Sequence, residues 1–84
     1  MNTIECDVYK STNRKYLYLF VPADEGLSRV PFELLEKFGK AEKAVSFMLT
    51  KHHTLAKEDP MRVLDNLEQF GYHLQLPPAD QSLV

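Results

Sequence analysis

The sequence has 84 residues, of which 44% are hydrophobic and 26% are charged, and its formal net charge at pH 7 is −2. This length suits one domain with one compact core, and the slight negative charge gives no overall attraction to phosphate backbones or anionic lipid headgroups. The longest apolar stretch, residues 17–23, is far shorter than the roughly 20 residues of a membrane-spanning helix, so we expect no membrane association.

Cysteine usage and the first residues bear on the cellular compartment. Cys6 is the only cysteine, so no internal disulfide can form and stability must come from packing, as is typical of a reducing compartment. Residues 1–7 include two acidic side chains and no basic one, unlike the charged start of a secretory signal peptide. We therefore expect a cytoplasmic protein.

Two strands joined by a turn are predicted at the start of the chain. Residues 4–10 alternate between apolar and polar side chains, and Cys6 falls on the apolar face. This pattern indicates a half-buried strand at the edge of a sheet. Residues 11–14 are polar and predict a hairpin turn. Residues 15–21 carry large apolar side chains on both faces, which indicates an interior strand.

A loop, a short helix and a third strand are predicted next. Pro22 lacks a backbone donor and is followed by turn-forming residues, so the chain is expected to leave the sheet there. A helix is predicted over 31–38, because Pro31 suits a first helical position and Gly39 can close the helix in a left-handed conformation. Residues 44–49 are largely apolar on both faces, which predicts another interior strand.

The clearest helix is predicted over residues 59–70. Asp59 can accept a hydrogen bond from a free amide of the first turn, Pro60 presets the backbone angle, and apolar residues recur at helical spacing up to Gly71. Residues 72–76 then alternate and predict a short fourth strand, which ends at two prolines that lack backbone donors.

The element order is therefore β-β-α-β-α-β, and we predict an α+β fold with a four-stranded sheet and two helices over residues 1–78. Residues 79–84 are expected to form a flexible C-terminal tail. Periodicity leaves open the order of the strands and whether the helices cover one or both faces of the sheet. The predicted core consists of residues on the apolar faces of these elements: Cys6, Leu17, Leu19, Phe47, Leu64, Leu67 and Phe70.

Five segments spread along the chain together resemble the YcgL family of small gammaproteobacterial proteins. They are residues 6–11 (CDVYKS), 16–18 (YLY), 28–31 (SRVP), 34–39 (LLEKFG) and 71–78 (GYHLQLPP). The resemblance implies an α/β/α sandwich, with helices on both faces of the sheet, and it implies neither an established activity nor catalytic residues. The family's closing motif has two tyrosines where this chain has Tyr72 and His73, so no role of a second aromatic side chain is carried over.

Several chemistries that the residue types allow lack the necessary arrangement. His52 and His53 are adjacent, so their side chains diverge, whereas metal ligands must converge. Cys6 lies on an apolar face, where an inert buried thiol is expected rather than a nucleophile. The three glycines are isolated and do not form a phosphate-binding loop. We predict no catalytic, cofactor-binding or metal-binding residues.

A cluster of basic residues is the one candidate site. Lys10, Arg14 and Lys15 bracket the predicted hairpin turn beside Tyr9 and Tyr16. Positive charge is thus interleaved with aromatic side chains, as in proteins that bind single-stranded nucleic acid. Arg29 precedes a predicted helix start, whose free amides favour anions. We predict a patch of these four basic residues that binds an anion or a partner. The simpler interpretation is a solvated turn and a surface arginine.

Two functional hypotheses stay open. The first is a small non-enzymatic cytosolic interaction module that binds a protein, because the chain offers a compact scaffold without a catalytic constellation. The alternative is a nucleic-acid-associated accessory protein in RNA metabolism that uses the basic patch, and a small enzyme is a distant third. No cofactor is expected. An exposed apolar patch would favour the first hypothesis and a contiguous basic surface the second.

Overall fold

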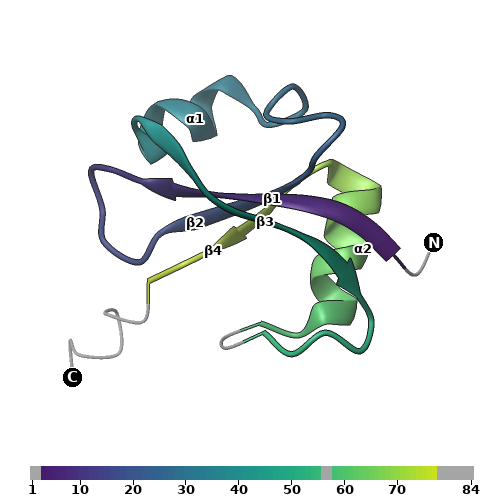
Figure 1. Cartoon of the computed structure of the whole chain (residues 1–84). Helices are drawn as coiled ribbons and strands as arrows, with labels where there is room; N and C mark the ends of the chain where they lie inside the picture. Colours follow the sequence, from purple (N-terminus) through teal and green to yellow (C-terminus); the bar gives the residue numbers. More distant parts are fainter. Residues whose placement is uncertain (1–2, 56–57, 78–84) are drawn as a thin grey trace.

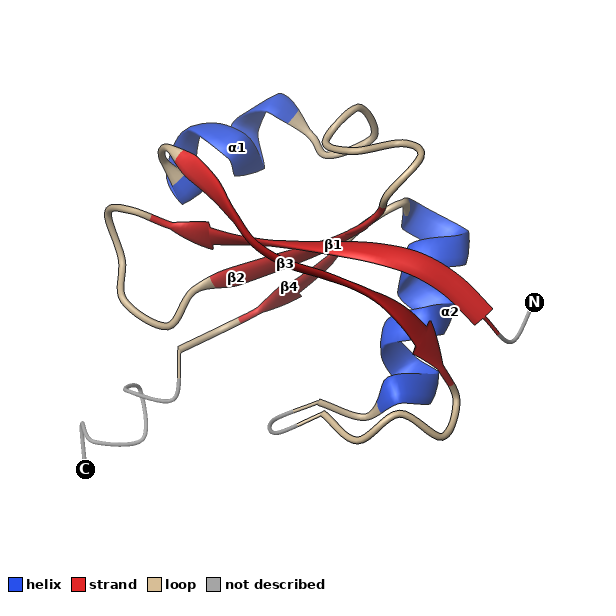
Figure 2. Ribbon diagram, in the orientation of Figure 1, coloured by secondary structure: helices blue, strands red, loops and turns tan. Residues whose placement is uncertain are grey.

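The computed structural model describes residues 3–55 and 58–77, which form a four-stranded sheet and two helices (Figure 1 and Figure 2). The strand order is β3-β1-β2-β4, and each neighbouring pair is antiparallel. The elements along the chain are β1 (Thr3–Ser11), β2 (Tyr18–Pro22), α1 (Phe32–Phe38), β3 (Ala41–Thr50), α2 (Pro60–Phe70) and β4 (His73–Gln75). The predicted α+β class and element order are confirmed. The tail expected at 79–84 lies outside the described residues.

Helix α2 begins and ends where the sequence predicts. Asp59 has an extended backbone (φ −81°, ψ 119°), and its Oδ1 accepts a hydrogen bond from the Met61 N–H at 3.0 Å. This bond satisfies one of the free amides of the first turn, and Pro60 follows with its backbone angle preset. Gly71 closes the helix in the left-handed conformation (φ 86°), where its N–H donates to two carbonyls of the last turn.

Helix α1 is shorter and less firmly capped. Pro31 occupies the N-cap position, so the helix begins at Phe32, one residue later than predicted, and no side chain caps its first turn. It ends at Phe38 as predicted, and the Gly39 N–H donates to the Leu35 carbonyl at 3.0 Å. Gly39 has the positive φ (82°) that was expected, but its ψ of −159° differs from the predicted left-handed helical conformation. Within 3–55 and 58–77, neither helix combines the length and the apolar character needed to cross a membrane.

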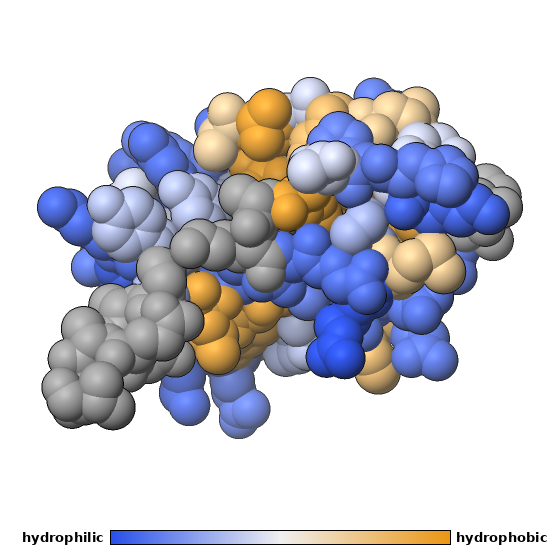
Figure 3. All heavy atoms as spheres, turned by 90° about the horizontal axis from the view of Figure 1, so that it is seen from below, coloured by the Kyte–Doolittle hydropathy of each residue, from blue (hydrophilic) through white to orange (hydrophobic). Residues whose placement is uncertain are grey.

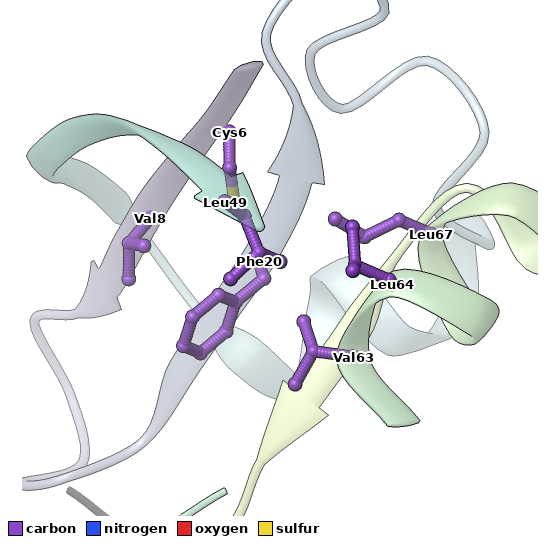
Figure 4. Close-up of a cluster of buried hydrophobic side chains, with 7 residues drawn as sticks. All are labelled: Cys6, Val8, Phe20, Leu49, Val63, Leu64 and Leu67. Atoms are coloured by element: carbon purple, nitrogen blue, oxygen red, sulfur yellow. The ribbon is translucent and has the colours of Figure 1, made fainter. Parts of the chain in front are cut away.

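One hydrophobic layer lies between the sheet and α2 (Figure 4). Side chains from three strands point toward α2, and the helix contributes the residues at the spacing of one buried face. We call this side of the sheet the α2 face. The buried residues of this layer are Cys6, Val8, Phe20, Leu49, Val63, Leu64 and Leu67.

A second layer lies on the opposite face of the sheet, beneath α1. Its buried residues come from β2, α1 and the segments before these two elements: Leu17, Leu19, Val21, Val30 and Phe38. Figure 1 shows the two helices on opposite sides of the sheet. The structure is therefore an α/β/α sandwich, as the family resemblance implies, and this answers the question that periodicity left open.

Two strand positions differ from the prediction. β1 lies inside the sheet between β3 and β2, although the sequence predicted an edge strand, and β3 lies at the edge, although it was predicted to be interior. The error has a physical reason. The polarity of a strand's faces reports which layers cover those faces and carries no information about the neighbours within the sheet. Asp7, for example, points to the α1 side of the sheet, where Ser46 of β3 donates a hydrogen bond to it and Lys43 of β3 forms an ion pair with it.

The predicted core is largely correct, with one clear error. Five of its members are buried: Cys6, Leu17, Leu19, Leu64 and Leu67. Phe47 is half-buried and packs against the α2-face layer. Phe70 was predicted to be buried but is 54% exposed. Phe70 is the last residue of α2, and helical periodicity gives the direction of a side chain but not how far the sheet extends beneath it.

Candidate interaction surface

Helix α2 leaves part of its face of the sheet uncovered, and a pocket of about 220 Å³ opens there. All four strands and the loop after β3 contribute to its lining, which is mainly apolar. The lining residues are Val8, Tyr18, Phe20, Val45, Phe47, Leu55 and Gln75. We call it the apolar pocket. Figure 3, which views the molecule from below Figure 1, shows hydrophobic residues at the surface among hydrophilic ones.

Strand register explains why these side chains meet. Val8 pairs with Phe20 of β2 and with Val45 of β3, and Tyr18 of β2 pairs with Gln75 of β4. Directly paired residues of antiparallel strands project to the same face of a sheet. The pairs therefore place a row of large side chains across the whole α2 face, beside the region that α2 itself covers.

The outer wall of the apolar pocket belongs to the edge strand β3. Val45 is 49% exposed there, while Phe47 is half-buried and stacks on His53 with ring centroids 4.7 Å apart. A β-bulge separates this part of β3 from its first residues, because the register with β1 shifts between Val8 and Tyr9. An exposed apolar side chain at a pocket wall is a feature of surfaces that other molecules cover.

A second, more polar pocket adjoins the first at the hairpin turn. It has a volume of about 440 Å³ and is lined by Lys10, Ser11, Thr12, Lys15, Tyr16, Tyr18 and Glu42. We call it the hairpin pocket. Tyr18 lines both pockets, so the apolar pocket and the more polar hairpin pocket adjoin at this residue.

Tyr16 has an unusual backbone in this turn. Its φ is 64°, which makes it the non-glycine residue with positive φ in the described ranges, and its side chain is 59% exposed. A bulky residue in the left-handed region costs about 1–3 kcal/mol, and such strain is often found at functional sites. The strained backbone holds an exposed aromatic ring at the rim of the hairpin pocket.

Three of the four predicted basic residues lie together at this turn. Lys10 forms an exposed ion pair with Glu42, with Nζ 3.7 Å from Oε1. Lys15 lines the hairpin pocket, and Arg14 precedes it in the same turn. Neither Arg14 nor Lys15 forms an ion pair with any residue in the described part of the chain.

Arg29, the fourth predicted residue, lies at the other end of the sheet. It lines a pocket with Ile4 near the start of β1, whereas Lys10 is near the end of that strand, about 20 Å away at about 3.3 Å per residue. Its guanidinium donates to the Gln69 carbonyl at 3.1 Å and pairs with Glu25 at 3.5 Å. A cation at the C-terminal end of α2 stabilises the helix. The structure therefore does not bring Arg29 to the hairpin.

The sequence matches a known family over most of its length. The family model described as the YcgL domain matches residues 6–78. The chain belongs to the YcgL domain family. A YcgL domain-containing protein of Pseudomonas putida (strain W619) is 47% identical over 79 residues, which cover 94% of this chain and 81% of the relative. Relatives with the same coverage are 46% identical in Azotobacter vinelandii and 43% identical in Pseudomonas paraeruginosa.

These relatives confirm the resemblance, and their names state a domain without an activity. Within the ranges 3–55 and 58–77, no group of three or more His, Cys, Asp or Glu side chains could hold a metal ion. His52 is exposed, whereas the His53 ring packs against Phe47.

His73 takes part in a buried network that the sequence did not predict. Its side chain is 7% exposed and lies edge-on to Phe20, with centroids 5.8 Å apart. Asn66 Nδ2 donates to Nδ1 at 2.8 Å, so the ring proton is on Nε2 and is donated to Glu58 Oε1 at 2.7 Å. Both ring nitrogens are thus engaged, and the network links β4, α2 and the segment before α2.

A second buried polar group lies on the opposite face of this YcgL domain. Asp7 is 6% exposed. Its Oδ1 accepts a hydrogen bond from Ser46 Oγ at 2.7 Å, and its Oδ2 lies 3.3 Å from Lys43 Nζ. A buried carboxylate needs such partners to offset the loss of hydration. These contacts fasten β1 to the edge strand β3, so they support a structural role.

Cys6 is expected to resist thiol reagents in the folded domain. It is fully buried, and this burial raises the pKa of its thiol to about 12. Because only the thiolate is nucleophilic, iodoacetamide at near-neutral pH should label the native protein far more slowly than the protein in denaturant. Mass spectrometry of timed samples checks this. Equal labelling rates in the two conditions would show that Cys6 is accessible and reactive.

Proposed function

We propose that this chain is a non-enzymatic interaction module that binds a protein partner in the cytoplasm through the apolar pocket. The observation that carries the proposal is the exposed, largely apolar concavity on the α2 face, walled by Val45 and Phe47 of the edge strand. Burying apolar surface contributes about 25 cal/mol per Å² and is the main favourable term in protein association.

The competing nucleic-acid hypothesis has weaker support. It needs a contiguous basic surface, but Arg29 lies at the other end of the sheet and Lys10 is paired with Glu42. Two of the buried groups that could perform acid–base chemistry are engaged in contacts within the fold. His73 uses both ring nitrogens, and the Asp7 carboxylate is bound by Ser46 and Lys43. The exposed apolar pocket therefore supports binding of a protein segment more than binding of nucleic acid.

Replacing Val45 with aspartate tests the proposal. A carboxylate at the wall of the apolar pocket would lose its hydration when the partner binds. We therefore expect the Val45→Asp variant to bind the partner at least about tenfold more weakly than wild type. Met48→Asp is the matched control, because Met48 lies on the same strand, is 52% exposed compared with 49% for Val45, and projects to the opposite face.

The measurement is affinity capture of tagged wild type and both variants from native cells, with and without nuclease. A protein partner that binds wild type and Met48→Asp, resists nuclease and is lost from Val45→Asp supports the proposal. Circular dichroism melts establish that both variants are folded. Nuclease-sensitive binding, or a partner that Val45→Asp retains, would show that the apolar pocket is not the site.

A further inference from the structure

The hairpin pocket extends the proposed docking surface toward a group of basic side chains. Tyr18 forms a wall of both pockets, so a partner segment that inserts an apolar side chain beside Val45 continues directly past Tyr18 toward Lys10 and Lys15. If one apolar side chain of the partner fills the apolar pocket, the partner residues next to it therefore lie at the hairpin pocket.

The charges at this end are predominantly positive and largely unpaired. Arg14 and Lys15 make no ion pair within the described residues, and Lys10 has only an exposed contact with Glu42 at 3.7 Å. Exposed pairs of this kind contribute little to stability, so an incoming carboxylate can replace Glu42. The opposite end of the sheet differs, because its pocket contains several carboxylates, among them Glu5, Asp24 and Glu25.

The turn that carries these cations is anchored to the rest of the fold. Ser11 Oγ donates to the Phe38 carbonyl at 2.6 Å and accepts the N–H groups of Asn13 and Arg14, each at 3.1 Å. Such bonds fix the backbone from which Arg14 and Lys15 project. Tyr16, whose backbone has a positive φ, adds an exposed aromatic side chain beside them. A prearranged surface loses less conformational entropy when a partner binds.

From this charge complementarity we infer that the partner presents an acidic segment, in which carboxylates next to an apolar anchor bind Lys10, Arg14 and Lys15. This inference rests on the proposed docking at the apolar pocket and names the chemistry of the segment that docks. A protein segment is favoured over single-stranded RNA because the cations adjoin a pocket lined by aliphatic and aromatic side chains with Glu42 at the rim.

The test begins with a random peptide library displayed on phage and selected on the full-length purified protein. We expect enriched sequences that combine bulky apolar residues with adjacent Asp or Glu. Fluorescence anisotropy then compares an enriched peptide, the same peptide with its acidic residues replaced by amides, and a uridine oligonucleotide. The acidic peptide should bind more tightly than the other two. Its affinity should fall as salt rises from about 0.1 M to about 1 M, where the Debye length shrinks from about 10 Å to about 3 Å.

Charge-reversed variants separate this inference from the proposed function. Arg14→Glu with Lys15→Glu should weaken binding of the acidic peptide at least about tenfold and leave the amide peptide unaffected. Lys51→Glu with Arg62→Glu makes the same change in net charge outside both pockets and should bind as wild type does. Melting temperatures should stay nearly constant, because exposed charges contribute little to stability.

Each other outcome overturns one of the two ideas. If Val45→Asp abolishes peptide binding while the variant with Arg14→Glu and Lys15→Glu binds normally, the proposed docking site is supported and the inference of an acidic segment is wrong. If Val45→Asp binds normally, the proposed function itself fails. Enrichment of basic sequences, or of none, contradicts the inference, and tighter binding of the oligonucleotide that the reversed hairpin abolishes would assign the surface to RNA.

Discussion

The Leu67→Ala variant is expected to lower the free energy of unfolding by about 2–5 kcal/mol. Leu67 is 1% exposed and lies in the layer between α2 and the sheet. Truncating its side chain removes buried apolar surface and leaves a cavity that a close-packed core fills only in part. Chemical denaturation of wild type and variant, with the midpoint and slope fitted separately, measures the loss.

Phe70→Ala is the matched control for this measurement. Phe70 lies on the same helix but is 54% exposed and belongs to neither hydrophobic layer, so its truncation should cost less than about 1 kcal/mol. If Phe70→Ala destabilised the protein as much as Leu67→Ala, the face of α2 that packs on the sheet would be assigned wrongly.

The Phe38→Ala variant should cost about 3–5 kcal/mol, the largest effect expected at any single position of the α1 layer. Phe38 is 1% exposed and packs with β2 residues on the face opposite α2. The Phe38 carbonyl that accepts the Ser11 hydroxyl belongs to the backbone, so that hydrogen bond is retained and the measured loss reports packing.

Phe32→Ala provides the corresponding control on α1. Phe32 is the first residue of the helix and is 72% exposed, so its removal should change stability by only about 0.5 kcal/mol. Thermal unfolding of the pair distinguishes a packed second layer from a helix that only rests on the surface. A small effect of Phe38→Ala would mean that α1 contributes little to the sandwich.

Local signals made both helices predictable. Asp59 and Gly71 carry capping chemistry that depends on their own side chains and backbone, so the ends of α2 follow from the sequence. Strand positions depend on pairing between distant segments. β1 pairs with β3, whose residues lie 30 to 47 positions later in the chain. Nothing in the alternation of residues 4–10 distinguishes a central strand from an edge strand.

The candidate surface was predictable only in part. The cations at the hairpin are neighbours in sequence, so a tight turn brings them together. The apolar pocket was missed because Phe47 was assigned to the core and the strand that contains Val45 was predicted to be interior. The lengths of the observed elements explain why part of the α2 face stays open, whereas the strand predicted over 44–49 is too short to show this. Helix α2 has 11 residues and is about 16 Å long, whereas β3 has 10 residues and spans about 33 Å, so the helix cannot cover the whole face.

The buried network around His73 shows what the sequence could not reveal. Its partners Glu58 and Asn66 come from two different segments, and their meeting depends on how α2 lies across β4. The alternation of β4 only indicates that His73 projects to the side opposite Leu74. That this side is buried beneath α2, and that the histidine finds two partners there, is a consequence of tertiary packing.

Nuclear magnetic resonance mapping of the bound partner tests the central claim most directly. The isotope-labelled protein is titrated with the captured partner or the selected peptide, and shift changes are assigned residue by residue. We predict the largest changes at the residues that line the apolar pocket: Val8, Tyr18, Phe20, Val45, Phe47, Leu55 and Gln75. Changes concentrated around α1, with the apolar pocket unaffected, would contradict the account.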